Sequence, residues 1–374
     1  MQNNLVLLHL SLIEGVGPAT VATLTHSSDD LTMLYTCTEC DLVALKGLSP
    51  ASAKKVVAGL QDSSLLEKEL ALIERHGIQW ATVQSAVYPE LLRPIYLPPV
   101  ILYWRGTLQM SGRVLAIVGS RKASRYGQMA IERMVPDLVE HGVCIVSGGA
   151  MGADSMAHAA TLDAGGQTLA VIGSGLLEPY PAFNKKLFER MADEGGAVVS
   201  SFPLETKPHP GNFPARNRII AGMSHACLVV QAAERSGALI TAQFALDQGK
   251  EILAVPGMIN DPLSGGCHDL IRNGAFLAAS AQDVLAVFGE FKEMAVVGSV
   301  GPSDESAQQL VLGAPLADDE SLSARIIRAC AQPRALEDLV FELDATLEEV
   351  MKELFELQLK GKVHQNFAGL WQIT

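Results

Sequence analysis

Short apolar runs alternate with amphipathic stretches from Val114 to about residue 288. Several of the runs are almost continuously apolar, which is typical of parallel strands that are covered on both faces. The expected strands are Val114–Val118, Val143–Ser147, Thr168–Ile172, Ala197–Ser201, Ala226–Val230 and Glu251–Val255. This alternation predicts an α/β fold built on an extended Rossmann-like, doubly wound parallel sheet. Ligands of such a sheet bind at the carboxyl ends of the strands.

The segment that precedes this region follows a different pattern. Residues 1–80 predict short helices, and two glycine-containing stretches, 13–20 and 45–52, look like a degenerate internal repeat. A helix-hairpin-helix or SAM-like domain, which aims helix N-termini at phosphates, and a small helical bundle that packs on its neighbour explain this repeat equally well. Residues 81–113 form a connector rich in proline and aromatic residues, and residues 100–104 are expected to form an extended edge strand.

The C-terminal part of the chain divides into a linker and a small domain. Periodicity is lost from Gly289 to Glu320, where Gly, Ser, Pro and Asp predict a linker. Helices are expected at 323–331, 335–343 and 347–360, followed by strands at 362–365 and 370–373, which together predict a winged-helix domain. Its middle is acidic, so contact with another protein competes with DNA reading as its role. The expected domains are therefore 1–80, 81–288 and 321–374, joined by the linker 289–320.

Two glycine turns follow the first two strands of the α/β region. Gly119-Ser120-Arg121 comes after the first strand, and Ser147-Gly148-Gly149-Ala150 comes after the second, each before a helix. Glycine lets a backbone approach a ligand closely, and a helix N-terminus favours an anion. Either turn alone is explained by tight βα connection, but the pair predicts a phosphate-binding crevice, with Arg121 and Lys122 at its mouth. Neither turn matches the strict dinucleotide fingerprint, so NAD binding is not favoured.

Later turns at the same edge carry residues of the same kinds. The stretches are 180–188, with Asn184, Lys185 and Phe188; 213–222, with Arg216, Asn217 and Arg218; and 236–242, with Ser236, Gly237 and Thr241. A row of such turns suits a chain of phosphates rather than one phosphate. Phe188 is a candidate stacking platform for an unpaired base. A solvated helix face is the alternative explanation for Lys185.

Composition limits the possible functions. Hydrophobic residues make up 48% of the 374 residues, which allows a large core, and no apolar run approaches the length of a membrane span. With no candidate leader or membrane span, a cytoplasmic protein is expected, and the six scattered cysteines indicate neither a disulfide framework nor a metal site. The net charge of −13 opposes nucleic-acid binding. However, residues 289–374 hold 15 acidic and 7 basic residues, so much of the excess lies outside the α/β region.

The motifs as a set resemble the family of DNA-processing protein A, also called Smf. The resemblance rests on Val118–Arg121, Ser147–Ala150, Tyr180-Pro181 with Asn184, Phe213–Gly222, Ser236–Ala242 and Ala254–Gly257, in the family's order across the α/β region. It implies a protein that binds single-stranded DNA, forms a homodimer and loads the RecA recombinase during natural transformation, with single-strand-binding protein as a further candidate partner. It implies no catalytic residue, cofactor or metal ion.

The resemblance also implies roles for individual residues. Arg121 and Lys185 would contact phosphates, Phe188 would stack on a base, and Arg216, Asn217 and Arg218 would line the groove. The full set of expected DNA-binding residues is Gly119, Ser120, Arg121, Lys122, Gly148, Gly149, Asn184, Lys185, Phe188, Arg216, Asn217, Arg218, Ser236, Gly237 and Thr241. The competing hypothesis is a hydrolase of nucleotide monophosphates, which needs a carboxylate beside the phosphate turns. Asp154 and Glu234 are the nearby candidates, and departures such as Gln231, where the family usually has an acidic residue, argue against inherited nucleotide chemistry.

Overall fold

The structure is a computed structural model of the chain. It describes residues 2–26, 30–44, 48–110, 112–289, 322–330, 339–340, 343, 345–360, 362–365 and 371–373. These residues belong to two compact units, Met1–Ala295 and Val296–Thr374, and each unit is described by itself.

All six strands expected from the apolar runs are present in the first unit. Their bounds are β3 Val114–Val118, β4 Cys144–Ser147, β5 Thr168–Val171, β6 Ala197–Ser200, β7 Ala226–Val229 and β8 Glu251–Ala254. They pair in parallel in the order β6-β5-β4-β3-β7-β8. Every residue of these strands is buried except Glu251, because helices cover both faces of the sheet.

Three further strands extend the sheet to nine. A two-residue strand, β9 (Phe276–Leu277), pairs in parallel with β8, whereas β1 (Gln79–Thr82) and β2 (Ile101–Gly106) add an antiparallel pair beyond β6. The expectation that residues 100–104 form an edge strand is wrong in one respect. This segment pairs with both β1 and β6, so β1 occupies the edge, and the first four residues of β2 are buried.

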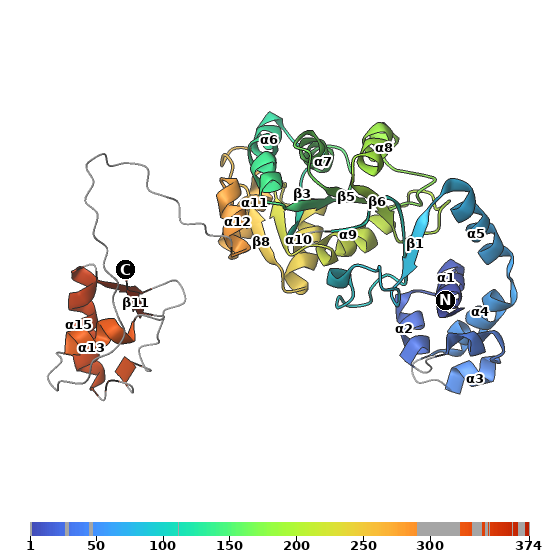
Figure 1. Cartoon of the computed structure of the whole chain (residues 1–374), viewed down its shortest axis with the longest axis horizontal. Helices are drawn as coiled ribbons and strands as arrows, with labels where there is room; N and C mark the ends of the chain where they lie inside the picture. The colour runs from blue at the N-terminus through green and yellow to red at the C-terminus, as the bar shows by residue number, and fades with distance from the viewer. Residues whose placement is uncertain are drawn as a thin grey trace, which may run out of the picture. The chain divides into compact units, whose positions relative to one another are not determined.

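The helices that connect the strands lie on the two faces of the sheet. Helices α6, α7 and α8 cover one face, and α9 and α10 cover the other (Figure 1). Their bounds are α6 Arg125–Glu140, α7 Ala153–Asp163, α8 Lys185–Asp193, α9 Asn212–Gly222 and α10 Gly237–Asp247; α11 Gly265–Arg272 and α12 Ala281–Val287 follow β8 and β9.

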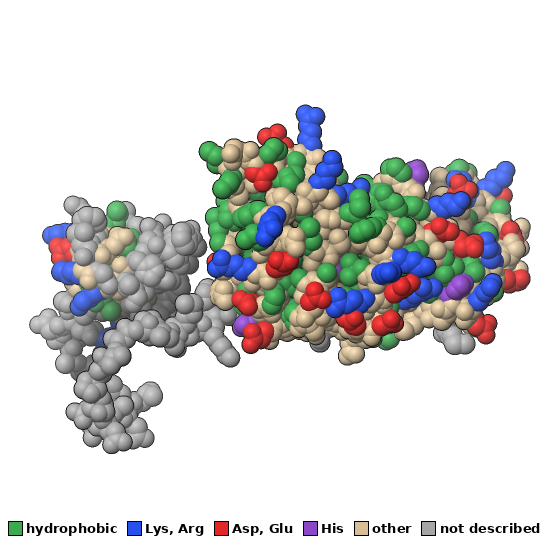
Figure 2. All heavy atoms as spheres, turned by 90° about the horizontal axis from the view of Figure 1, so that it is seen from above, with side chains coloured by type: hydrophobic (Ala, Val, Ile, Leu, Met, Phe, Trp, Pro, Cys, Tyr) green, Lys and Arg blue, Asp and Glu red, His purple; other side chains and the backbone are tan. Residues whose placement is uncertain are grey.

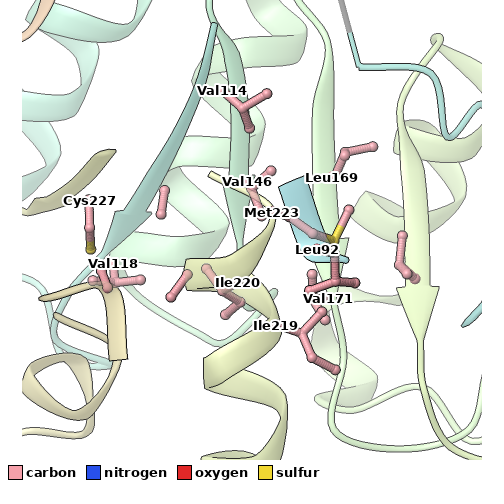
Figure 3. Close-up of a cluster of buried hydrophobic side chains, with 14 of the residues drawn as sticks. Leu92, Val114, Val118, Val146, Leu169, Val171, Ile219, Ile220, Met223 and Cys227 are labelled. Atoms are coloured by element: carbon pink, nitrogen blue, oxygen red, sulfur yellow. The ribbon is translucent and has the colours of Figure 1, made fainter. Parts of the chain in front are cut away.

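Alternate residues of each central strand pack on opposite helical layers. In β3, Leu115 and Ile117 join the cluster that contains residues of α6 and α7. The side chains of Val114 and Val118 join the cluster formed with Ile219 and other residues of α9. Figure 3 shows this second cluster, in which strand side chains meet those of α9 and of Leu92 from the connector. The short helices η2 Glu90–Leu92 and η3 Ala182–Asn184 lie in loops. The two cores hold the carboxyl ends of the strands in fixed register.

The N-terminal segment is helical, as predicted. Its helices are α1 Gln2–Leu12, α2 Pro18–His26, η1 Leu31–Tyr35, α3 Glu39–Ala44, α4 Pro50–Gln61 and α5 Ser64–His76. One helix begins within each of the two glycine-containing stretches, at Pro18 and at Pro50, although residues 45–47 lie outside the described residues. This segment shares a compact unit with the sheet, since Thr82 donates a hydrogen bond to Asn4 (2.7 Å) and Glu69 accepts one from the Leu204 amide (2.9 Å). The division at residue 80 and the DNA-binding role of the repeat stay predictions.

The second unit contains part of the expected C-terminal domain. Helices α13 (Leu322–Ala329) and α15 (Leu347–Leu359) and the antiparallel strands β10 (Val363–Gln365) and β11 (Trp371–Ile373) lie within the expected ranges or one residue outside them. The helix expected at 335–343 and the linker 289–320 fall mostly outside the described residues. Ile326, Cys330, Val350 and Leu354 form the centre of a separate core. The winged-helix assignment therefore stays a prediction.

The described residues also bear on two expectations from composition. None of the helices in them is long and apolar enough to cross a membrane. The six cysteines are free, and Cys144 in β4 and Cys227 in β7 are buried.

Candidate functional site

The strand order reverses between β3 and β7. From β3 the chain builds the sheet outward through β4, β5 and β6, and then crosses to β7 on the other side of β3. The connections that leave these neighbouring strands therefore diverge and open a crevice at their carboxyl ends, which is where open α/β sheets bind ligands.

This crevice is a groove of about 490 Å³, which we call the switch-point groove. Its lining comes from the turn after β3, the N-terminal parts of α7, α9 and α10, and the segment after β7. The lining residues are Val118, Gly119, Ser120, Arg121, Lys122, Ala150, Asp154, Phe213, Pro214, Arg216, Asn217, Ile220, Ala233, Arg235, Ser236, Gly237, Ala238, Ile240 and Thr241. Nine of the fifteen residues expected from the sequence line this groove: Gly119, Ser120, Arg121, Lys122, Arg216, Asn217, Ser236, Gly237 and Thr241.

The turn after β3 is held tightly against its neighbours. A Cβ atom on Gly119 would lie 2.7 Å from the Ala153 Cβ and 3.2 Å from the Gln231 carbonyl oxygen, so a larger residue would push the turn outward. The Ser120 amide donates to the Gln231 carbonyl (2.7 Å), and the Ser120 hydroxyl accepts from the Lys122 amide (3.1 Å). The fixed turn leaves Arg121 and Lys122 exposed at the mouth of the groove.

An aromatic ring supports the exposed Arg121 side chain. The Arg121 Cζ lies 5.3 Å from the centroid of the Phe213 ring, which is within cation–π range. The ring also lies close to Gly173, where a Cβ would come within 3.0 Å of Phe213 Cδ1. Phe213 thus restricts where the Arg121 guanidinium can go, and less entropy is lost when that group binds a ligand.

A buried arginine lies on the floor of the groove. Arg216 is 5% exposed and Asp154 is 7% exposed, and both approach Gly148: a Cβ there would clash with the Arg216 Nη1 and lie 2.6 Å from the Asp154 Oδ2. Burial lowers the pKa of Arg216 to about 10, against the opposing effect of Asp154. Burial also raises the pKa of Asp154, although the Arg216 charge and the Ala150 amide pull it down. For both groups, desolvation therefore outweighs the attraction between the charges.

The N-terminus of α10 forms the opposite wall. The Ser236 hydroxyl caps the helix by accepting from the Ala238 amide (3.3 Å), and the Asn217 side chain donates to the Gly237 carbonyl (3.4 Å). Amide N–H groups and the helix dipole at this end favour an anion. Thr241, one turn further along, is 2% exposed and closes the inner end of the wall.

The second glycine turn lies beside the groove. Asn184, which was expected to contact DNA next to this turn, is buried against it. Gly149 has φ +64°, in the left-handed region that favours glycine. The Asn184 amide, 3% exposed, donates to the Gly149 carbonyl (2.9 Å). The expectation that Asn184 faces the DNA is wrong: it fixes the turn. Gly148 does not line the switch-point groove but an adjoining cleft that shares Arg121 and Arg216 with it.

The structure also corrects the expected role of Phe188. This residue is 5% exposed and packs in the core beneath the second glycine turn, where a Cβ on Gly149 would come within 2.7 Å of its ring. Because Phe188 and Met191 form the buried side of α8, no base can stack on the ring where it lies. Lys185, by contrast, is exposed at the first position of α8, outside the groove lining that the described residues provide.

Arg218 points away from the groove, contrary to expectation. Its Nη1 donates to the carbonyl groups of Tyr96 (3.0 Å) and Leu97, so it fastens the connector to α9. Two residues correspond to roughly 200° of rotation around a helix, so Arg216 and Arg218 cannot share a face.

Three of the lining residues that sequence reasoning missed have side chains that bear on ligand binding. Arg235, exposed, and Ile240, 44% exposed, line it beside the expected Ser236, and Phe213 supports Arg121. A signal for Arg235 was available, because it directly precedes Ser236 at the carboxyl end of a predicted strand. No such signal exists for Phe213, whose position depends on how α9 packs.

Among the described residues, the candidate acid and base groups are either buried or outside the groove lining. Asp154 is the one acidic residue among those described that line the groove, and it accepts a hydrogen bond from the Ala150 amide (3.2 Å). Glu234 is exposed, outside that lining. His158 is fully buried against Thr168 (2.7 Å), and burial lowers its pKa to about 3. Within the described residues, no group of three or more His, Cys, Asp or Glu side chains is placed to hold a metal ion.

The cations of the groove are a local feature. Arg121, Lys122, Arg216 and Arg235 line it against the single carboxylate of Asp154. Figure 2 looks onto the side of the molecule where α6, α7 and α8 lie, and there Lys and Arg side chains are interspersed with Asp and Glu. A positive potential therefore arises from this grouping and not from the overall charge of −13.

Comparison with known proteins gives consistent matches. The family model for DNA recombination-mediator protein A matches residues 79–289. The chain is 42% identical to DNA processing protein DprA of Bacillus subtilis over 221 residues, which covers 59% of this chain and 74% of that protein. It is 32% identical to Protein Smf of Synechocystis over 382 aligned positions, with 95% of each chain covered.

Two solved structures resemble the chain. DNA processing protein A from Streptococcus pneumoniae superposes with a TM-score of 0.60 at 35% identity, over 72% of this chain and 98% of that one. DNA processing protein A from Helicobacter pylori, whose structure describes its single-stranded DNA binding mode, gives a TM-score of 0.51 at 26% identity, over 57% of this chain and 96% of that one.

Proposed function

Since the chain belongs to the family of DNA recombination-mediator protein A, we propose that it binds single-stranded DNA in the switch-point groove. The observation that carries the proposal is the convergence of four cations, the β3 turn and the N-terminus of α10 on one open groove. A cationic groove can follow a phosphate backbone, and the Helicobacter pylori relative is described as binding single-stranded DNA.

Each phosphate contact has a defined place in this proposal. Arg121, held by Phe213, contacts a phosphate at the mouth of the groove, and Arg216 contacts one at its floor. The amides at the start of α10 receive a further phosphate between Ser236 and Asn217. Lys185 extends the path toward α8. Phe188 and Asn184 support the second glycine turn beneath this path.

We further propose that the bound strand is handed to the RecA recombinase and that the protein acts as a homodimer during natural transformation. The proposal extends the family name, recombination mediator, to this chain. It is tested by RecA filament formation on single strands coated with single-strand-binding protein, followed with and without the full chain. Filament growth that is no faster with the chain present would contradict the loading role.

The groove is tested by fluorescence anisotropy with the full chain and a labelled oligothymidylate, at several salt concentrations. Arg121→Ala and Lys185→Ala should each weaken binding and reduce the slope of log affinity against log salt by about 0.7, the value for one phosphate contact on a single strand. Arg113→Ala is the matched control, because Arg113 is exposed just before β3, at the opposite edge of the sheet.

Equal affinities and equal salt slopes for the Arg121→Ala and Arg113→Ala variants would place the DNA elsewhere. Unlabelled duplex and mononucleotides serve as competitors in the same titration. Release of ribose phosphate from nucleotide monophosphates would instead support the competing hydrolase hypothesis. The geometry does not favour that hypothesis, because the carboxylate of Asp154 already accepts the Ala150 amide beside Arg216.

A further inference from the structure

We propose that Phe183, with the neighbouring Tyr180, forms a stacking surface for an unpaired base of the strand whose phosphates the groove holds. The inference rests on the proposed function and adds the feature by which the site would distinguish single strands from duplex. The observation is exposure: Phe183 is 86% exposed and Tyr180 is 43% exposed, whereas Phe188, the aromatic residue expected from the sequence, is buried.

The loop that carries Phe183 is fixed on both sides. The Tyr180 ring packs against the Phe213 ring, with centroids 5.9 Å apart and planes tilted by 51°. On the other side, Asn184 is tied to the Gly149 carbonyl. Phe183 therefore projects from an anchored turn, so a base that stacks on it meets a surface that is already ordered, and little conformational entropy is lost.

The loop adjoins the groove. Tyr180 and Pro181 line the cleft that shares Arg121 and Arg216 with the switch-point groove. Phe183 follows Pro181 by two residues, so their Cα atoms are separated by no more than about 8 Å. A strand with phosphates at Arg121 can therefore present a base to this loop.

The charges around Phe183 suit the backbone of the same strand. Lys185 and Lys186 are exposed two and three residues after it in the chain, and Arg121 lies on the groove side of the loop. Isolated apolar residues are common on protein surfaces and need no special explanation. An exposed ring on an anchored loop, flanked by cations on both sides, instead matches the combination used to bind unpaired nucleotides.

The test compares two labelled strands of equal length, an oligothymidylate and an abasic strand with the same phosphates. Phe183→Leu removes the ring and keeps an apolar side chain. It should weaken oligothymidylate binding by about 5- to 150-fold, the loss of one stacked base, without changing the salt slope. On the abasic strand, the variant and the wild type should bind equally well. Phe183→Trp should retain or strengthen binding to the oligothymidylate.

Tyr96→Leu is the matched control, because Tyr96 is also an aromatic residue that is 86% exposed, in the connector beside Arg218. It should leave both affinities unchanged. Melting temperatures of all variants check that the fold is retained, which is expected because Phe183 buries little surface.

The outcomes separate this inference from the proposed function. If the wild type binds neither strand, the proposed function itself fails. If the wild type binds but Phe183→Leu binds the oligothymidylate equally well, or loses the same factor on the abasic strand, the stacking surface is refuted and the groove stands.

Discussion

Replacing Arg216 by methionine tests the charge interaction between the buried Arg216 and Asp154 beneath the groove. The change keeps an apolar stem of similar length but leaves the Asp154 carboxylate, 7% exposed, without its cation. Removing one partner of a buried pair costs about 3–5 kcal/mol of unfolding free energy. Asp154 keeps its hydrogen bond from the Ala150 amide, so we expect a loss near the lower end, about 3 kcal/mol at neutral pH.

The size of this loss should depend on pH in a defined direction. Burial already raises the pKa of Asp154, and Arg216 opposes that rise, so removing Arg216 raises the pKa further. A carboxyl group whose pKa is higher in the folded than in the unfolded state holds its proton when folded. The unfolding free energy of the variant is therefore closest to that of the wild type near pH 4. As the pH rises toward the pKa of Asp154 in the folded variant, this free energy falls by up to about 1.4 kcal/mol per pH unit.

Urea unfolding of the full chain, followed by circular dichroism between about pH 4.5 and pH 8, measures this dependence. The double variant Asp154→Asn, Arg216→Met should recover most of the lost stability and its pH dependence, because no buried charge remains. A loss that does not change with pH, or a double variant whose loss is the sum of the single losses, would refute the coupling between these two groups.

Two further substitutions test neighbouring features of the site. Gly148→Ala should displace the Arg216 guanidinium, because the new Cβ would clash with Nη1, and should weaken oligothymidylate binding in the anisotropy titration. Arg218→Ala should leave DNA affinity unchanged but lower the melting temperature by a few degrees, because it removes the bonds to the Tyr96 and Leu97 carbonyls. If Arg218→Ala weakened DNA binding without lowering the melting temperature, Arg218 would instead be a DNA contact.

The parallel strands could be predicted from the sequence because burial on both faces requires nearly unbroken apolar runs. Runs such as Val114–Val118 carry that signal directly. The strand β9 has two residues, both exposed, and β1 is half exposed, so neither gives a comparable pattern. The prediction that residues 100–104 form an edge strand was wrong. These residues pair with both β1 and β6, and this pairing depends on the strand order, which no local sequence pattern encodes.

The site could be predicted at the level of turns but not of every side chain. The glycine and serine turns after β3 and before α10 meet because β3 and β7 pair, a consequence of topology. Side-chain direction was decided by packing, which placed Arg218 on the connector and Phe188 in the core. For Phe188 the sequence held a usable signal: Phe188 and Met191 recur at helical spacing, with charged residues at the positions between them.

The energetics of the buried pair bear on why it lies in this groove. Burial disfavours the charged forms of both Arg216 and Asp154 more than their mutual attraction favours them, so the pair is a poor source of stability. A polynucleotide phosphate at the groove floor would supply the negative charge that the guanidinium lacks. Because the chain carries a net charge of −13, the proposed attraction of DNA has to come from local groups of cations, such as those that line this groove, and not from the overall charge. Burying Arg216 costs free energy, and binding of a phosphate at the groove floor is the best explanation for why it lies there.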